Sequence, residues 1–116
     1  MKKILAMALF MSSSLIAVTA SASGDIVAGK ALVEKYSCAA CHGADFKTPI
    51  DPTYPKLAGQ HVDYLEHALT GYKRGNAANG RVNAIMSVQV KPLSGKDVKD
   101  IAAYLHSLPG TLVVRR

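Results

Sequence analysis

The feature that most constrains how this chain can fold is one short segment, Cys38-Ala39-Ala40-Cys41-His42, which contains both cysteines of the 116-residue sequence. A chain of this length forms one small domain with a thin hydrophobic core, and such domains usually need reinforcement. A disulfide between Cys38 and Cys41 would close too short a loop to stabilise the whole domain. We therefore expect the domain to fold around a buried cofactor.

The spacing of the segment indicates which cofactor. Two cysteines separated by two residues and followed by a histidine are the attachment pattern of c-type haem. Two thiols about one helical turn apart can each bond a vinyl group of the same porphyrin, and the histidine then ligates iron. Half of a zinc site and a thiol redox pair remain alternatives, although the first needs a second pair of ligands and the second a βαβ unit. We expect one haem c, bound covalently by Cys38 and Cys41, with His42 as a metal ligand.

Residues 1–22 have the pattern of a secretory signal peptide. Lys2 and Lys3 form a basic start, an apolar stretch runs from Ile4 to Val18, and small residues follow at Ala20-Ser21-Ala22. The apolar stretch is shorter than the roughly 20 residues that span a bilayer. The sequence therefore predicts cleavage of this segment after Ala22.

Cleavage would leave residues 23–116 as one domain, which we expect to be periplasmic and to have no membrane span. The formal net charge of the whole sequence is +6, and Lys2 and Lys3 account for two of these charges. The other Lys and Arg residues are scattered, whereas nucleic acids and membrane surfaces attract dense basic clusters. We therefore expect no nucleic-acid partner.

The predicted domain is all-α, with three main helices wrapped around the haem. The first helix starts with Asp25 as N-cap and runs to about Ser37. The second runs from about Gln60 to Tyr72, and Gly75 is a natural stop after it. The third follows a capping box at Ser94-Gly95-Lys96-Asp97 and ends at Pro109-Gly110.

Two long loops separate these helices, Gly43 to Gly59 and Gly75 to Leu93. Loops longer than about 12 residues are uncommon in compact domains unless they serve a function. We expect each loop to cover one face of the haem. A short strand is predicted only near the end of the chain, at Thr111 to Val114.

The second metal ligand is predicted to be Met86. The other three methionines all lie in the expected signal peptide, and Met86 lies in the second long loop. A lone methionine is usually core filler, but a loop position makes this less fitting than ligation of iron. The competing ligands are histidines: His67 and His106 are predicted on polar helix faces, and His61 is the strongest competitor.

Several pieces of the chain match the pattern of one family, namely Cys38 to Gly43, Tyr54 to Gly59, Ala84 to Met86 and Ile101 to Leu105. In these pieces the chain resembles the small bacterial class I cytochromes c, and the resemblance extends from Gly29 to Leu108. It implies a small cytochrome c fold, in which a helix, the haem motif, a proline loop, a helix, a methionine loop and a C-terminal helix follow one another.

The resemblance also implies two contacts. The carbonyl of Pro55 should accept a hydrogen bond from the ring of His42, which would orient the imidazole and tune its basicity. The first and last helices should cross closely at a glycine, with Gly29 against Tyr104 or Leu105. Our candidates for contacts with the haem propionates are Tyr72 and Arg81, because a phenol and a guanidinium suit carboxylates.

These expectations together predict a soluble single-electron carrier and not an enzyme. His42 and Met86 would fill both axial positions of the iron, which leaves no open site for a substrate. Its partners would be redox proteins that make transient contacts near the exposed haem edge. An electron-transfer subunit of a larger dehydrogenase or oxidase, and a haem enzyme or gas sensor, are the alternatives.

Overall fold

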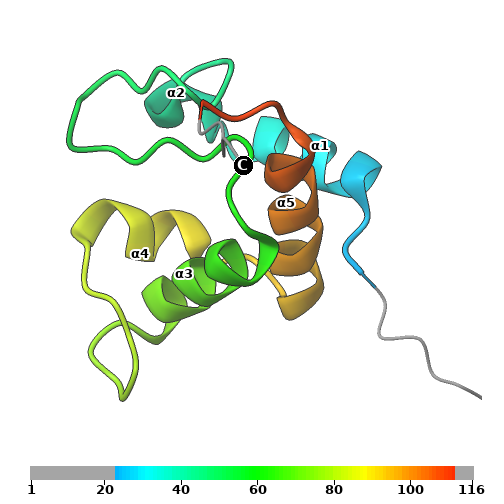
Figure 1. The fold of residues 1–116 in the computed structure, drawn as a ribbon. Helices are drawn as coiled ribbons and strands as arrows, with labels where there is room; N and C mark the ends of the chain where they lie inside the picture. Colours follow the sequence, from blue (N-terminus) through cyan, green and yellow to red (C-terminus); the bar gives the residue numbers. More distant parts are fainter. Residues whose placement is uncertain (1–22, 112–116) are drawn as a thin grey trace, which may run out of the picture.

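The structure, a computed structural model, describes residues 23–111, and this part of the chain is helical with no strand. Five helices follow one another: α1 (Ile26–Lys35), α2 (Ala39–His42), α3 (Val62–Arg74), α4 (Ala84–Val90) and α5 (Gly95–Ser107) (Figure 1). The prediction of an all-α domain is confirmed. Positions 112–114 of the predicted strand and the predicted signal peptide lie outside the described residues.

The three predicted helices correspond to α1, α3 and α5, and their caps explain where they begin and end. The Asp25 side chain accepts hydrogen bonds from the backbone N–H groups of Val27 and Ala28, so α1 begins as expected. Helix α5 starts with the predicted capping box of Ser94 and Asp97. Helix α3 lies two residues later than predicted, and its C-cap is Gly75, which has a φ of 56°.

Two short helices, α2 and α4, were not predicted. Helix α4 lies within the second long loop and carries Met86, so the prediction that Met86 lies in a loop is wrong. Asn83 caps α4 by accepting hydrogen bonds from the N–H groups of Ile85 and Met86 at 3.0 and 2.9 Å. Seven residues are too few to show a helical period, and so short a helix depends on tertiary packing, which a sequence pattern does not reveal.

The core lies where α1 and α3 pack on α5, and α4 adds to it by packing on α3. Figure 1 shows α1 crossing α5 on one side of the molecule, with α3 and α4 below the loop that follows α2. The buried hydrophobic side chains come from all of these parts except α2 and include Val33, Phe46, Leu65, Val90, Leu93, Val98, Ile101, Ala102 and Leu105.

Helices α1 and α5 cross at Gly29, as expected. A Cβ atom added to Gly29 would lie 2.0 Å from the backbone oxygen of Asp100 and 2.8 Å from the Cβ of Tyr104. Only glycine permits backbones to approach so closely. The predicted contact of Gly29 with Tyr104 is therefore confirmed.

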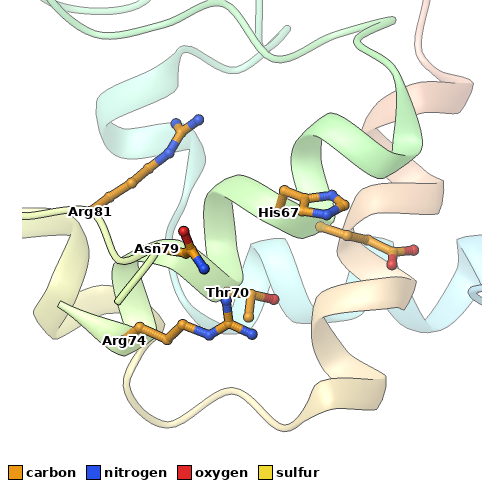
Figure 2. A pocket seen from close by; sticks show the side chains of 6 residues that line it. His67, Thr70, Arg74, Asn79 and Arg81 are labelled. Atoms are coloured by element: carbon orange, nitrogen blue, oxygen red, sulfur yellow. The ribbon is translucent and has the colours of Figure 1, made fainter. Parts of the chain in front are cut away.

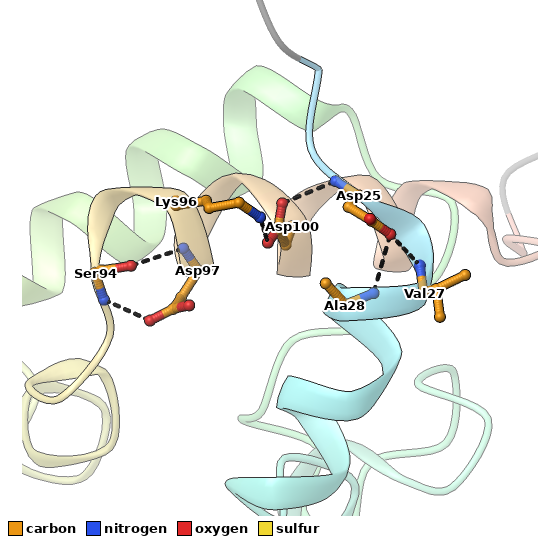
Figure 3. Close-up of polar contacts among 7 residues, drawn as sticks. All are labelled: Asp25, Val27, Ala28, Ser94, Lys96, Asp97 and Asp100. Atoms are coloured by element: carbon orange, nitrogen blue, oxygen red, sulfur yellow. Dashed lines mark hydrogen bonds and ion pairs between the residues drawn. The ribbon is translucent and has the colours of Figure 1, made fainter.

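A buried carboxylate ties the two helices together beside this crossing. Asp100 is only 3% exposed, and its Oδ1 accepts a hydrogen bond of 2.8 Å from the backbone N–H of Asp25 (Figure 3). Its Oδ2 lies 2.5 Å from the Nζ of Lys96. Desolvation alone would raise the pKa of Asp100, but the bonds from Lys96 and Asp25 outweigh it and lower this pKa below the ordinary value.

We expect Asp100→Asn to lower the free energy of unfolding by about 1 kcal/mol at neutral pH, because the ionic bond to Lys96 is lost. The pKa of Asp100 is lower in the folded protein, so its contribution to stability is present above the unfolded value near 4 and disappears as the pH falls through the folded value. The stability of the variant and that of the wild type should therefore converge as the pH falls through the folded pKa of Asp100.

Chemical denaturation at a series of pH values measures this difference. Glu66→Gln, on a partly exposed position of α3 beyond its first turn, is the matched control and should follow the wild type throughout. A stability difference for Asp100→Asn that stays constant down to pH 2 would contradict the assigned role.

Candidate haem-binding site

The first part of the site is the cysteine segment, which the structure folds into α2. Cys38 directly precedes the helix, and Cys41 and His42 occupy its last two positions. Ser37 has a φ of 52°, which turns the chain from α1 into α2, and the N–H of Cys38 bonds the carbonyl of Val33. Residues three apart in helical backbone share a face, so Cys38, at the N-cap, and Cys41, within α2, lie about one turn apart. The side chains of both cysteines are partly exposed.

The surroundings of the two cysteines do not fit a thiol redox pair, because such a motif lies in a βαβ unit and residues 23–111 contain no strand. Burial, together with the neighbouring Cys41, raises the pKa of Cys38 above its ordinary value despite a backbone hydrogen bond that lowers it. Redox-active cysteines instead have lowered pKa values that favour the thiolate. As for zinc, residues 23–111 contain no group of three or more His, Cys, Asp and Glu side chains that could hold a metal ion.

His42 is oriented by the predicted hydrogen bond. The residue is 6% exposed, and its Nδ1 lies 2.9 Å from the backbone oxygen of Pro55. A carbonyl oxygen can only accept, so Nδ1 must donate and therefore carries the proton. Nε2 is then the ring nitrogen with the lone pair, which is the form of histidine that ligates a metal.

The loop that supplies Pro55 is fixed at several points. Near its start, the N–H of Ile50 bonds the carbonyl of Cys41 at 3.1 Å, and at its end the N–H of Gly59 bonds the carbonyl of Leu105 in α5 at 2.9 Å. Tyr54, just before Pro55, places its ring centroid 6.3 Å from that of His42. The sequence did not single out Tyr54 as a site residue, although it belongs to one of the pieces on which the resemblance rests.

Met86 comes from the other side of the site. It is partly buried, packs against the hydrophobic core and lies near His42. Its backbone is held by the Asn83 cap of α4. A histidine nitrogen with a free lone pair, a thioether and two thiols on one helical turn are the donors that haem c uses, so the residues present fit this group.

The three competing histidines all lie on the surface. His67 and His106 are exposed, as predicted, and their Nδ1 atoms bond the carbonyls of Asp63 and Gln60 at 2.7 and 2.8 Å. His61 is exposed as well and occupies the N-cap position of α3. Only His42, among the four histidines, is buried.

The structure brings Tyr72 and Arg81 together and adds Tyr64 to them. The Arg81 guanidinium carbon lies 5.4 Å from the ring centroid of Tyr64 and 5.7 Å from that of Tyr72. The polar contacts of the two tyrosines raise the pKa of Arg81 above its ordinary value. The backbone N–H of Arg81 bonds the carbonyl of Gly71 on α3 at 2.8 Å. The spacing of Tyr64 and Tyr72, eight residues apart on one helix, is the signal that could have identified Tyr64.

A polar hollow of about 380 Å³ lies beside this cluster and is lined by Glu66, His67, Thr70, Arg74, Asn79 and Arg81 (Figure 2). The guanidinium of Arg74 points toward Thr70, and that of Arg81 points away from Arg74. The two cations therefore do not converge on one point. Neither the cysteine segment nor Met86 lines this hollow.

Within residues 23–111, no helix is both long enough and apolar enough to cross a membrane.

Comparison with known proteins assigns the chain to a family. Residues 26–109 match the family model for cytochrome c. Cytochrome c4 of Stutzerimonas stutzeri is 41% identical over 98 residues, which cover 80% of this chain and 45% of that protein. Cytochrome c-554(548) of Halomonas halodenitrificans is 39% identical over 85 residues, which cover 73% of this chain and 98% of that protein.

A solved structure agrees with these matches. The crystal structure of reduced recombinant cytochrome c4 from Pseudomonas stutzeri superposes with a TM-score of 0.68 at 39% identity, over 77% of this chain and 48% of that one. The chain thus spans less than half the length of the cytochrome c4 relatives and nearly the whole of cytochrome c-554(548). The chain belongs to the cytochrome c family, as a class I c-type cytochrome whose cysteine segment fits haem c.

Proposed function

We propose that this protein is a soluble carrier of single electrons, with one haem c bound to Cys38 and Cys41 and with His42 and Met86 as the axial ligands of its iron. The observation that carries the proposal is the hydrogen bond from the Nδ1 of His42 to the carbonyl of Pro55. Because of this bond, Nε2 of the buried histidine is the ring nitrogen whose lone pair is free to ligate a metal, and the histidine directly follows the second cysteine.

The proposed ligands explain why electron transfer is favoured over catalysis. Haem iron supplies a one-electron couple when it is bound. Nε2 of His42 and the sulfur of Met86 would fill both axial positions, so no substrate could reach the metal. The thioether of Met86 favours the reduced state and raises the potential, and the carbonyl of Pro55 tunes the basicity of His42. Tyr72 and Arg81 would contact the propionates, since phenol and guanidinium groups bind carboxylates.

Export is part of the proposal. Residues 1–22 would be removed as a signal peptide, and the domain of residues 23–116 would act in the periplasm. The intact mass of the mature protein should equal that of a chain beginning at Ser23 plus one haem. The double variant Cys38→Ala and Cys41→Ala should lose the covalent haem, because no other cysteine can replace them. A mass increment of zero or two haems in the wild type would refute the single attachment site.

The partners of the carrier would be redox proteins that dock transiently near the haem edge beside the two cysteines. Lys47, Lys56 and Lys91 would line this contact, and all three are at least partly exposed. Such contacts are weak and depend on charge, so electron-transfer rates should fall as the ionic strength rises.

One observation favours a second candidate, an electron-transfer subunit of a larger dehydrogenase or oxidase. Val82, Ile85 and Val88, spaced three residues apart along and just before α4, are exposed, and Val88 is 68% exposed. Several exposed apolar side chains close together often mark a docking surface. A stable complex on purification from the native source would support this candidate, and a free protein would support the carrier.

A further inference from the structure

Phe46 combines two properties that rarely occur together. Its φ is 54°, in the left-handed region that bulky side chains avoid, and its side chain is only 3% exposed. The other residues with positive φ in the described part of the chain, glycines excepted, are Ser37 and Asn79, which are small or commonly tolerate this conformation. A strained backbone around a buried ring persists only where its surroundings hold it in place.

The backbone of Phe46 connects the two partners of the His42 to Pro55 hydrogen bond. Its N–H bonds the carbonyl of Gly43, the residue after His42, at 3.0 Å. Its own carbonyl accepts hydrogen bonds from the N–H groups of Leu57 and Ala58 at 2.8 and 3.1 Å. Leu57 is two residues beyond Pro55, so Phe46 joins the chain just after the histidine to the chain just after the proline.

The ring of Phe46 fixes this junction to the rigid part of the fold. It packs edge-on against Tyr104 of α5, with ring centroids 6.3 Å apart and an interplanar angle of 89°. The Cβ of Tyr104 lies at the close crossing of α1 and α5 beside Gly29. Asp45, the residue before Phe46, accepts hydrogen bonds from the N–H groups of Lys47 and Thr48 at 2.8 and 2.9 Å, which holds the turn on its other side.

We propose that Phe46 is a positioning residue that sets the hydrogen bond between His42 and Pro55. Its left-handed backbone directs its carbonyl toward Leu57 and Ala58, and its buried ring holds that conformation against α5. Without the ring, the Phe46 carbonyl no longer holds Leu57 and Ala58 firmly. The hydrogen bond between His42 and the carbonyl of Pro55 then opens more often. This inference rests on the proposed function, in which His42 ligates the iron.

A residue that only filled the core would affect stability alone. The distinguishing quantity is therefore the rate at which the Nδ1 proton of His42 exchanges with solvent, measured by NMR on the reduced haem-containing protein. Exchange requires that the bond to Pro55 opens, either locally or through global unfolding. Val98→Ala, a core truncation in α5, is the matched control, because it lowers stability and leaves the loop intact.

We expect the Nδ1 proton of His42 to exchange roughly tenfold faster in Phe46→Ala than in Val98→Ala when the two variants are compared at equal global stability. The reason is that exchange in Phe46→Ala occurs through local opening of the loop as well as through global unfolding. Phe46→Leu keeps apolar bulk and should lie between the wild type and Phe46→Ala; it also serves if Phe46→Ala does not fold. Equal exchange rates in the Phe46 variants and in Val98→Ala would overturn the inference. A separate outcome concerns the proposed function: if the His42 signals of the wild type show no haem ring-current shift, the assignment of His42 as a ligand is refuted. The comparison of exchange rates would still test the role of Phe46 in that case.

Discussion

Met86→Ala is expected to abolish the near-infrared band that sulfur-to-iron charge transfer produces in the oxidised protein, and to lower the reduction potential by on the order of 100 mV or more. The physical reason is that the thioether stabilises the reduced metal, and alanine offers no donor to replace it. Water or a histidine would then complete the coordination and favour the oxidised state. The covalent haem should remain, because Cys38 and Cys41 are unchanged.

Optical spectra and potentiometry of the purified protein measure both effects. Val88→Ala is the matched control on the same helix, since Val88 is largely exposed and removal of its side chain leaves the Asn83 cap of α4 in place. It should retain the band and a potential close to that of the wild type. A wild-type protein that lacks this band, or a Met86→Ala protein with an unaltered potential, would rule out Met86 as the ligand, and His61 would then be the next candidate.

Gly29→Ala is expected to lower the free energy of unfolding by on the order of 3 kcal/mol or more, because its Cβ would lie 2.0 Å from the backbone oxygen of Asp100. Backbone cannot rotate away as a flexible side chain can, so the two helices must separate. Their separation would also weaken the bond between Asp25 and Asp100. For a domain of this size the melting temperature should fall by more than about 10 °C.

The control for this substitution is Gly95→Ala at the first position of α5. A Cβ at Gly95 meets no atom within 4 Å, and its φ is not positive. Because alanine favours the helix over glycine, this variant should be as stable as the wild type or more stable by up to about 1 kcal/mol. Thermal unfolding monitored by circular dichroism compares the two. If both variants were equally stable, the close crossing of α1 and α5 would not contribute to the free energy of unfolding.

The helices that the sequence predicted correctly are those whose signals are local. Asp25 and the Ser94 to Asp97 capping box determine helix starts through contacts within one turn, and the apolar periods of α3 and α5 extend over enough residues to be recognised. Helices α2 and α4 have four and seven residues. Such short helices form because neighbouring parts of the fold support them, and the sequence of the segment alone does not contain that information.

The features of the site also separate into those with a local sequence signal and those that depend on distant parts of the chain. The cysteine segment is a local pattern, and the contacts of His42 with Pro55 and of Gly29 with Tyr104 were anticipated only through the resemblance to a family. The positive φ of Phe46 follows from hydrogen bonds to residues more than ten positions away, and no propensity of phenylalanine indicates it.

The crossing of α1 with α5 has a consequence for the order of events during biogenesis. The two helices that make this contact are the first and the last of the described chain, so the contact cannot form until α5 has been synthesised. During synthesis the N-terminal part emerges first, so Cys38 and Cys41 leave the ribosome well before α5 exists. The attachment segment therefore passes through a stage in which it is accessible as open chain, before the last helix packs on the first and completes the native fold.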